Sequence, residues 1–211
     1  MPRRDVGSAV GYGWKKFTEN VGPFILLMLA VFVVSLVLSL IRQVVTPDSG
    51  GYGAVIIGLV LSAIVYIITS IVQAGVWRAG LGVTKGTTPS VAQLTETDNI
   101  VPYILTSILV GIGLIIGLVL CIIPGIIWLL FTAYAPIIAL DKGVGAVDAI
   151  KTSITMVKDN FGQVFVILLV AGIIWVVGYV LCCVGLLVTA PVALVTIVYS
   201  YRALNNETGV S

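Results

Sequence analysis

The sequence predicts an all-α fold, a polytopic membrane bundle of six transmembrane helices arranged as three tandem hairpin repeats. Its composition, its long apolar runs and the placement of its positive charges lead to this prediction. Of its 211 residues, 59% are hydrophobic and 9% are charged, whereas soluble domains carry about 25% charged residues. A water-exposed surface cannot be built from this set, so we expect one integral membrane domain over residues 1–211.

Four apolar runs supply the predicted spans, at residues 23–41, 54–77, 101–140 and 161–201. A helix crosses the hydrocarbon core with about 20 apolar residues. The last two runs would each form a straight helix about 60 Å long, which is about twice the thickness of the hydrocarbon core. Each must therefore fold back as a hairpin, with turn signals at Pro124-Gly125 and at Cys182-Cys183-Val184-Gly185.

Orientation follows from the basic residues. Arg42 alone lies in a connection from an odd-numbered to an even-numbered span, and the other ten Lys and Arg residues lie at the ends and in the opposite connections. Cytoplasmic segments carry the excess of Lys and Arg. Both termini are therefore predicted to be cytoplasmic.

A repeat is visible where each odd-numbered span begins. An acidic residue followed by asparagine stands there three times, with Asn20, Asn99 and Asn160 as its markers. We expect three units, at about residues 5–86, 87–143 and 144–207, each made of a cytoplasmic amphipathic segment, an outward span and an inward span.

The amphipathic segments show the helical period. In the first, the apolar face consists of Val6, Val10, Trp14 and Phe17; in the third, it consists of Val147, Ile150, Ile154, Val157 and Phe161. Thr88 and Pro89 are predicted to begin the shorter middle copy. Such segments could lie in the headgroup layer and dock lipid or a partner. We favour the alternative, an elbow that orients the next span, because repeated elements are usually structural.

No residue pattern indicates catalysis. The chain has no histidine, which excludes histidine-based acid–base chemistry, Ser-His-Asp triads and histidine metal ligands. No acidic residue lies within a predicted span, which argues against a proton- or ion-coupled pump. A net charge of +2 is too small for nucleic-acid binding. We therefore expect no catalytic residue, cofactor or metal.

The second span carries the most polar helix face, formed by Ser62, Tyr66, Thr69, Ser70 and Gln73. This polar stripe could line a path for a polar headgroup. It could equally supply hydrogen bonds between helices, worth about 0.6 kcal/mol each. We favour packing. Small residues at four-residue spacing, such as Ser35 with Ser39 and Gly58 with Ser62, allow helices to approach closely.

Cys121 and Cys182 occupy equivalent predicted outer turns. A disulfide is chemically permitted on the extracytoplasmic side, although the two residues could simply be apolar turn residues.

Several short motifs resemble a known family: GYGWKKF at 11–17, IPGI at 123–126, AP at 135–136 and NFG at 160–162. They resemble a broad bacterial family of six-span membrane proteins, especially its actinobacterial stand-alone members of unknown function. The same kind of membrane domain is fused to some glycerophosphodiester phosphodiesterases. The resemblance implies a plasma-membrane location. It carries over no catalytic residue, because the fused enzymes hold their chemistry on a separate soluble domain.

These observations favour a non-enzymatic subunit, scaffold or assembly partner in the plasma membrane. Its expected partners are membrane lipid and either another membrane protein or a second copy of itself. The alternative is a transporter or translocator of lipid or another amphiphile, and an enzyme ranks third.

Overall fold

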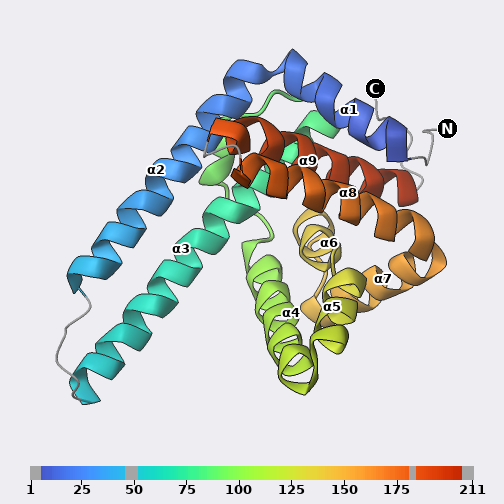
Figure 1. Cartoon of the computed structure of the whole chain (residues 1–211). Helices are drawn as coiled ribbons and strands as arrows, with labels where there is room; N and C mark the ends of the chain where they lie inside the picture. Colours follow the sequence, from blue (N-terminus) through green and yellow to red (C-terminus); the bar gives the residue numbers. More distant parts are fainter. Residues whose placement is uncertain (1–5, 46–51, 181–183, 206–211) are drawn as a thin grey trace.

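The computed structural model describes residues 6–45, 52–180 and 184–205, which form nine α-helices, one 3₁₀ helix and no strand (Figure 1). The elements are α1 (Val6–Glu19), α2 (Val21–Val45), α3 (Tyr52–Thr84), η1 (Val91–Leu94), α4 (Ile100–Leu120), α5 (Ile122–Phe131), α6 (Ala135–Lys142), α7 (Ala146–Asp159), α8 (Phe161–Val180) and α9 (Val184–Leu204). Six helical segments of these ranges are long and apolar enough to cross a membrane. The predicted fold class is therefore confirmed.

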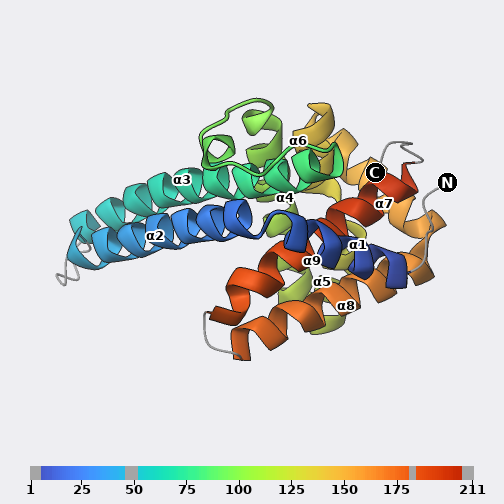
Figure 2. The same cartoon turned by 90° about the horizontal axis from the view of Figure 1, so that it is seen from above.

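The spans form three hairpins that diverge from a common base (Figures 1 and 2). The α2–α3 hairpin and the α4–α5 hairpin point in different directions in Figure 1, and Figure 2 shows α8 and α9 leaving in a third direction. The start of α1 and the end of α9 lie near each other at the base. The hairpins therefore meet at the base and separate toward their turns.

The third apolar run turns earlier than its sequence indicates. Helix α4 ends at Leu120, Cys121 takes an extended conformation with φ −176° and ψ 157°, and α5 begins at Ile122. The prediction of a turn at Pro124 and Gly125 is wrong by three residues. Pro124 lies in the first turn of α5, where a missing N–H removes no intrahelical hydrogen bond.

The inward half of this hairpin is also broken, which the sequence pattern did not indicate. Helix α5 ends at Phe131 and α6 begins at Ala135. The Ser153 hydroxyl of α7 fills the break: it donates to the Phe131 carbonyl at 2.8 Å and accepts from the Tyr134 N–H at 3.3 Å. A side chain from a neighbouring helix thus satisfies backbone groups that the break leaves open.

Two further boundaries differ from the prediction. Helix α3 continues to Thr84, so Arg78 lies within the helix rather than in the following loop. The middle amphipathic segment is a 3₁₀ turn that starts after Ser90, so the predicted start at Thr88 and Pro89 is wrong. The Ser90 N–H donates to Gln93 Oε1 at 3.0 Å, which favours this later start.

Helices α1 and α7 bury matching faces. The buried residues are Ala9, Gly13 and Phe17 in α1 and Ala149, Ser153 and Val157 in α7, in each case eleven, seven and three residues before Asn20 or Asn160. The buried faces are thus made mainly of small residues. Trp14 and Val147 of the predicted apolar faces are 54% and 55% exposed. Both helices pack on the bundle and leave part of their apolar surface outside.

The core lies at the base. Its largest cluster includes Ile137, Val157 and Val198 and the rings of Tyr134 and Tyr201, all fully buried. Helix α9 is the most enclosed span, since 67% of its apolar window is buried, and α1 packs along it. Helix α9 is therefore the central helix of the base.

Candidate functional site

A groove of about 360 Å³ lies between α2, α3 and α9, with one side chain from α8. The walls are apolar apart from a few neutral polar side chains. The lining residues are Met28, Val31, Val34, Ser35 and Leu38 of α2; Thr69, Val72, Gln73, Val76 and Trp77 of α3; Trp175 of α8; and Ala190, Ala193, Leu194 and Ile197 of α9. We call this surface the α3–α9 groove.

Two small residues of the groove wall stand close to an internal proline of α9. Ala190 directly precedes Pro191, and Ala193 follows it by two residues. Proline donates no backbone hydrogen bond, so the turn before it loses one intrahelical bond and can bend. On α3, Thr69 and Gln73 stand four residues apart and therefore share a helix face. Ala190 and Ala193 of α9 thus line the same groove as Thr69 and Gln73 of α3.

The groove contains no charged side chain. Ser35 Oγ donates to the Val31 carbonyl at 2.8 Å and is satisfied within its own helix. Thr69 and Gln73 are exposed, and among the described residues neither side chain makes a hydrogen bond. An unsatisfied polar group in hydrocarbon costs several kcal/mol. The Gln73 amide is therefore open to a hydrogen-bonding partner other than the described residues.

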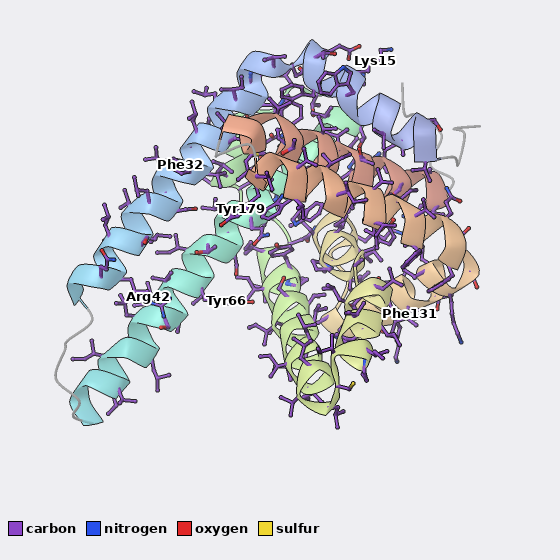
Figure 3. All side chains as sticks on the ribbon, viewed as in Figure 1. Lys15, Phe32, Arg42, Tyr66, Phe131 and Tyr179 are labelled. Atoms are coloured by element: carbon purple, nitrogen blue, oxygen red, sulfur yellow. The ribbon has the colours of Figure 1, made fainter. Side chains whose placement is uncertain are left out.

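The structure divides the predicted polar stripe. Thr69 and Gln73 line the α3–α9 groove, whereas Ser62 lines a separate pocket of about 270 Å³ with Arg42 and Gly58. Tyr66 is 42% exposed outside both pockets (Figure 3), and Ser70 is buried. Ser70 is thus positioned for packing, whereas Thr69 and Gln73 face the open groove. The role of the stripe stays a prediction.

The base holds a polar network that the sequence did not predict. The Arg78 guanidinium donates to the backbone carbonyls of Glu96 and Asp98 and lies 4.0 Å from the Glu96 carboxylate. These residues precede α4, so Arg78 fastens the end of the first hairpin to the start of the second. The one sequence feature that could have indicated this contact is the position of Arg78 directly after a long apolar run.

A second set of polar contacts joins α6, α9 and the residue that directly follows α3. Asp141 Oδ1 lies 3.4 Å from Lys85 Nζ, and Asp141 Oδ2 accepts a hydrogen bond from the Tyr201 hydroxyl at 3.1 Å. Nearby, the Tyr134 and Ser200 hydroxyls are 2.7 Å apart and share a hydrogen bond. All three hairpins are therefore connected at the base.

Helix α1 is held on α9 by aromatic contact. The rings of Tyr12 and Tyr199 have centroids 4.6 Å apart, and Lys16 Nζ lies 5.6 Å above the Tyr12 ring. Burial, with a smaller contribution from Glu19, raises the pKa of Tyr12 to about 12. The phenol is therefore neutral at physiological pH.

The asparagine markers fall into two kinds. Asn20 and Asn160 each donate the side-chain amide to the carbonyl four residues earlier, Lys16 or Met156, at 3.1 Å. Asn99 instead donates its side-chain amide to the backbone carbonyl of Leu140, 41 residues further along the chain. Units one and three are thus alike in detail, and the threefold scheme stays a prediction.

Two further expectations concern cysteine and metal. Cys121 is exposed at the turn between α4 and α5, but Cys182 lies outside the described residues, so the candidate disulfide stays a prediction. Within the residues that the structure places, no group of His, Cys, Asp and Glu could hold a metal ion.

Comparison with known proteins finds relatives that are themselves uncharacterized. The chain is 26% identical over 222 residues to the uncharacterized protein Rv2560 of Mycobacterium tuberculosis, covering 95% of this chain and 68% of that protein. The uncharacterized protein Mb2590 of Mycobacterium bovis matches with the same identity and coverage. No family model and no solved structure matches. These findings give no support to the resemblance to the phosphodiesterase-linked domain, which stays a prediction.

Proposed function

We propose that the chain is a non-enzymatic subunit or scaffold of a plasma-membrane assembly, with both termini in the cytoplasm. The observation that supports this proposal is the isolation of the α2–α3 hairpin. Only 11% of the apolar window of α2 and 6% of that of α3 are buried, against 67% for α9. In Figure 1 this hairpin extends away from the rest of the bundle.

A hairpin packed so little within its own chain is available to a partner. Lipid gives transmembrane helices no hydrophobic reason to associate, so they associate where small residues let backbones approach closely. On α3, no atom lies within 4 Å of the position that a Cβ at Gly58 would occupy. On α2, Ser39 is exposed. A transmembrane helix of another protein could therefore pack directly against this hairpin.

A pull-down in mild detergent tests this proposal. The full-length tagged protein is expected to retain a defined membrane protein after cross-linking in intact cells. Gly58→Leu should reduce recovery of that partner at least fivefold because the larger side chain blocks close approach. Gly111→Leu is the matched control, since that glycine also has an open Cβ position but belongs to α4.

The controls also separate the alternatives. Co-purification of two differently tagged copies would assign the hairpin to self-association rather than to a different subunit. Repeated isolation of a lone monomer, or equal loss of partner from both leucine variants, would contradict the proposal.

A second candidate function is transport of lipid or another amphiphile, which the α3–α9 groove favours. Two exposed polar side chains in an apolar groove suit a molecule with one polar and one apolar part. Reconstitution into vesicles tests this function through the rate at which a fluorescent lipid moves between leaflets. A rate equal to that of protein-free vesicles would exclude it.

A further inference from the structure

We propose that the α3–α9 groove binds one membrane lipid, whose uncharged ester or hydroxyl groups hydrogen-bond to Gln73 and Thr69 while an acyl chain lies along the apolar walls. This inference goes beyond the proposed subunit role, because the groove could bind a lipid whether or not a partner protein is present. It also gives the second candidate function a defined binding site.

The size of the groove favours a lipid chain over a partner helix. Its volume of about 360 Å³ falls in the range of small-molecule sites, about 300–1,000 Å³. A transmembrane helix about 10 Å wide and 30 Å long occupies roughly 2,400 Å³. The groove is thus large enough for part of a lipid and too small for a helix to enter.

The position of the groove gives membrane lipid access to it. It is lined by four membrane-spanning helices, and the exposed ring of Trp175 forms part of its wall. Gln73 stands five residues before Arg78, which corresponds to about 7.5 Å along the helix axis. Because Arg78 is anchored to the loop before α4, Gln73 lies one and a half turns deeper than the base. That depth suits the ester region of a lipid better than its headgroup.

The chemistry of the groove is neutral. The Gln73 amide can donate and accept hydrogen bonds, and the Thr69 hydroxyl can do the same. These groups match an ester carbonyl or a hydroxyl. A phosphate would require Arg or Lys, and no lining residue of the groove is charged. Binding should therefore depend on the polar linkage of the lipid and little on the charge of its headgroup.

Native mass spectrometry of the full chain, delipidated in mild detergent and then titrated with defined lipids, tests this inference. The probes are a diester phosphatidylcholine, its diether analogue and a diester phosphatidylglycerol with the same chains. The wild type is expected to retain one diester lipid per chain. Replacement by the diether should weaken binding roughly tenfold, equal to about 1.4 kcal/mol. Exchange of the headgroup should change binding less than twofold.

Two kinds of variant check the location. Gln73→Leu combined with Thr69→Val should weaken diester binding roughly tenfold and abolish the ester–ether difference. Ser62→Ala combined with Tyr66→Phe is the control on the same helix, because neither residue lines the groove, and it should behave as the wild type. Ala190→Leu should exclude lipid by filling the groove while leaving every polar group in place.

Each opposite result would overturn the inference. These results are no retained lipid in the wild type, equal loss in the groove and control variants, or a preference set by headgroup charge. Retention of a polypeptide in place of lipid, displaced by Ala190→Leu, would assign the groove to a partner helix. The pull-down with Gly58→Leu reports on the subunit role independently, so the two proposals can fail separately.

Discussion

Asn99, at the start of α4, donates its side-chain Nδ2–H to the carbonyl of Leu140, near the end of α6, at 3.0 Å across 41 positions of the chain. Asn99 has a left-handed backbone, with φ 53° and ψ 21°. Its Oδ1 lies 2.6 Å from where a Cβ at Gly143 would stand, and Gly143 also has a positive φ, 64°. The two ends of the second hairpin are therefore held together by the Asn99 side chain, which occupies the space that Gly143 leaves by having no Cβ.

Removal of the Asn99 side chain should destabilise the protein in two separable steps. Asn99→Gly keeps access to the left-handed backbone and loses the hydrogen bond, at a cost of about 1 kcal/mol. Asn99→Ala should cost about 1 kcal/mol more, since alanine disfavours that conformation. Equilibrium unfolding in a mixed-micelle titration measures both. Asn160→Ala loses only a bond within its own turn and should cost less; an equal loss would contradict this account of Asn99.

The docking of α1 on α9 depends on Gly13. A Cβ at that position would lie 2.8 Å from the Val192 carbonyl oxygen and 2.5 Å from Thr196 Oγ1. Gly13→Ala should therefore push the helices apart and cost about 1–3 kcal/mol. Gly11→Ala, where no atom lies within 4 Å, should stabilise α1 by up to about 1 kcal/mol. Thermal unfolding followed by circular dichroism compares them, and a loss of stability in Gly11→Ala would refute the contact model.

The contacts of Asp141 should differ in strength. Tyr201 is fully buried and donates its hydroxyl to this carboxylate, so Tyr201→Phe should cost about 1.5–3 kcal/mol. The Lys85 side chain is 56% exposed, and Lys85→Ala should cost less than about 1 kcal/mol because water screens the pair. Unfolding titrations of both variants and of the wild type provide the comparison. A larger loss in Lys85→Ala would reverse the ranking.

The raised pKa of Tyr12 gives a dependence on alkaline pH. The phenol ionises at about 10 in the unfolded chain and at about 12 in the folded protein, because burial disfavours the charged form. The unfolded chain therefore loses its proton first, and stability should fall between pH 10 and 12. Tyr12→Phe should flatten that decline, measured as the unfolding midpoint at pH 9 and pH 11. It should cost little at neutral pH, since the buried hydroxyl makes no hydrogen bond to any residue that the structure describes. Identical pH profiles for the two proteins would exclude this role.

The spans could be predicted because lipid imposes a simple rule. Backbone groups in hydrocarbon must pair within a helix, so run length alone sets the number of crossings. The exact turn was harder to predict. Pro124 is a strong turn signal, yet proline is equally suited to the first turn of a helix, and the chain turns at Cys121. The break after Phe131 depends on Ser153 of α7, a contact that no local pattern contains.

The candidate site could be predicted only in part. Helical spacing puts Thr69 and Gln73 on one face of α3, because that depends on the helix period alone. Whether a side chain meets a groove or a neighbouring helix depends on the helices around it. Ser70 follows Thr69 directly, yet it is buried while Thr69 lines the groove. The opposite wall of the α3–α9 groove comes from Ala190, Ala193 and other residues of α9, more than a hundred positions away.

The exposed Cys121 provides a test of the predicted orientation. The turn between α4 and α5 should face the outside, because each cytoplasmic connection carries Lys or Arg and this turn carries none. With Cys182 and Cys183 replaced by serine, a membrane-impermeant maleimide should label Cys121 in intact cells.

The matched control moves the thiol to the opposite end of the same hairpin. Gly145→Cys in a chain lacking the native cysteines places it in the exposed connection between α6 and α7. It should react only after the cells are permeabilised. Labelling of Gly145→Cys but not of Cys121 in intact cells would show that the orientation is opposite to the predicted one. The result would apply to all six spans, because they are linked in series.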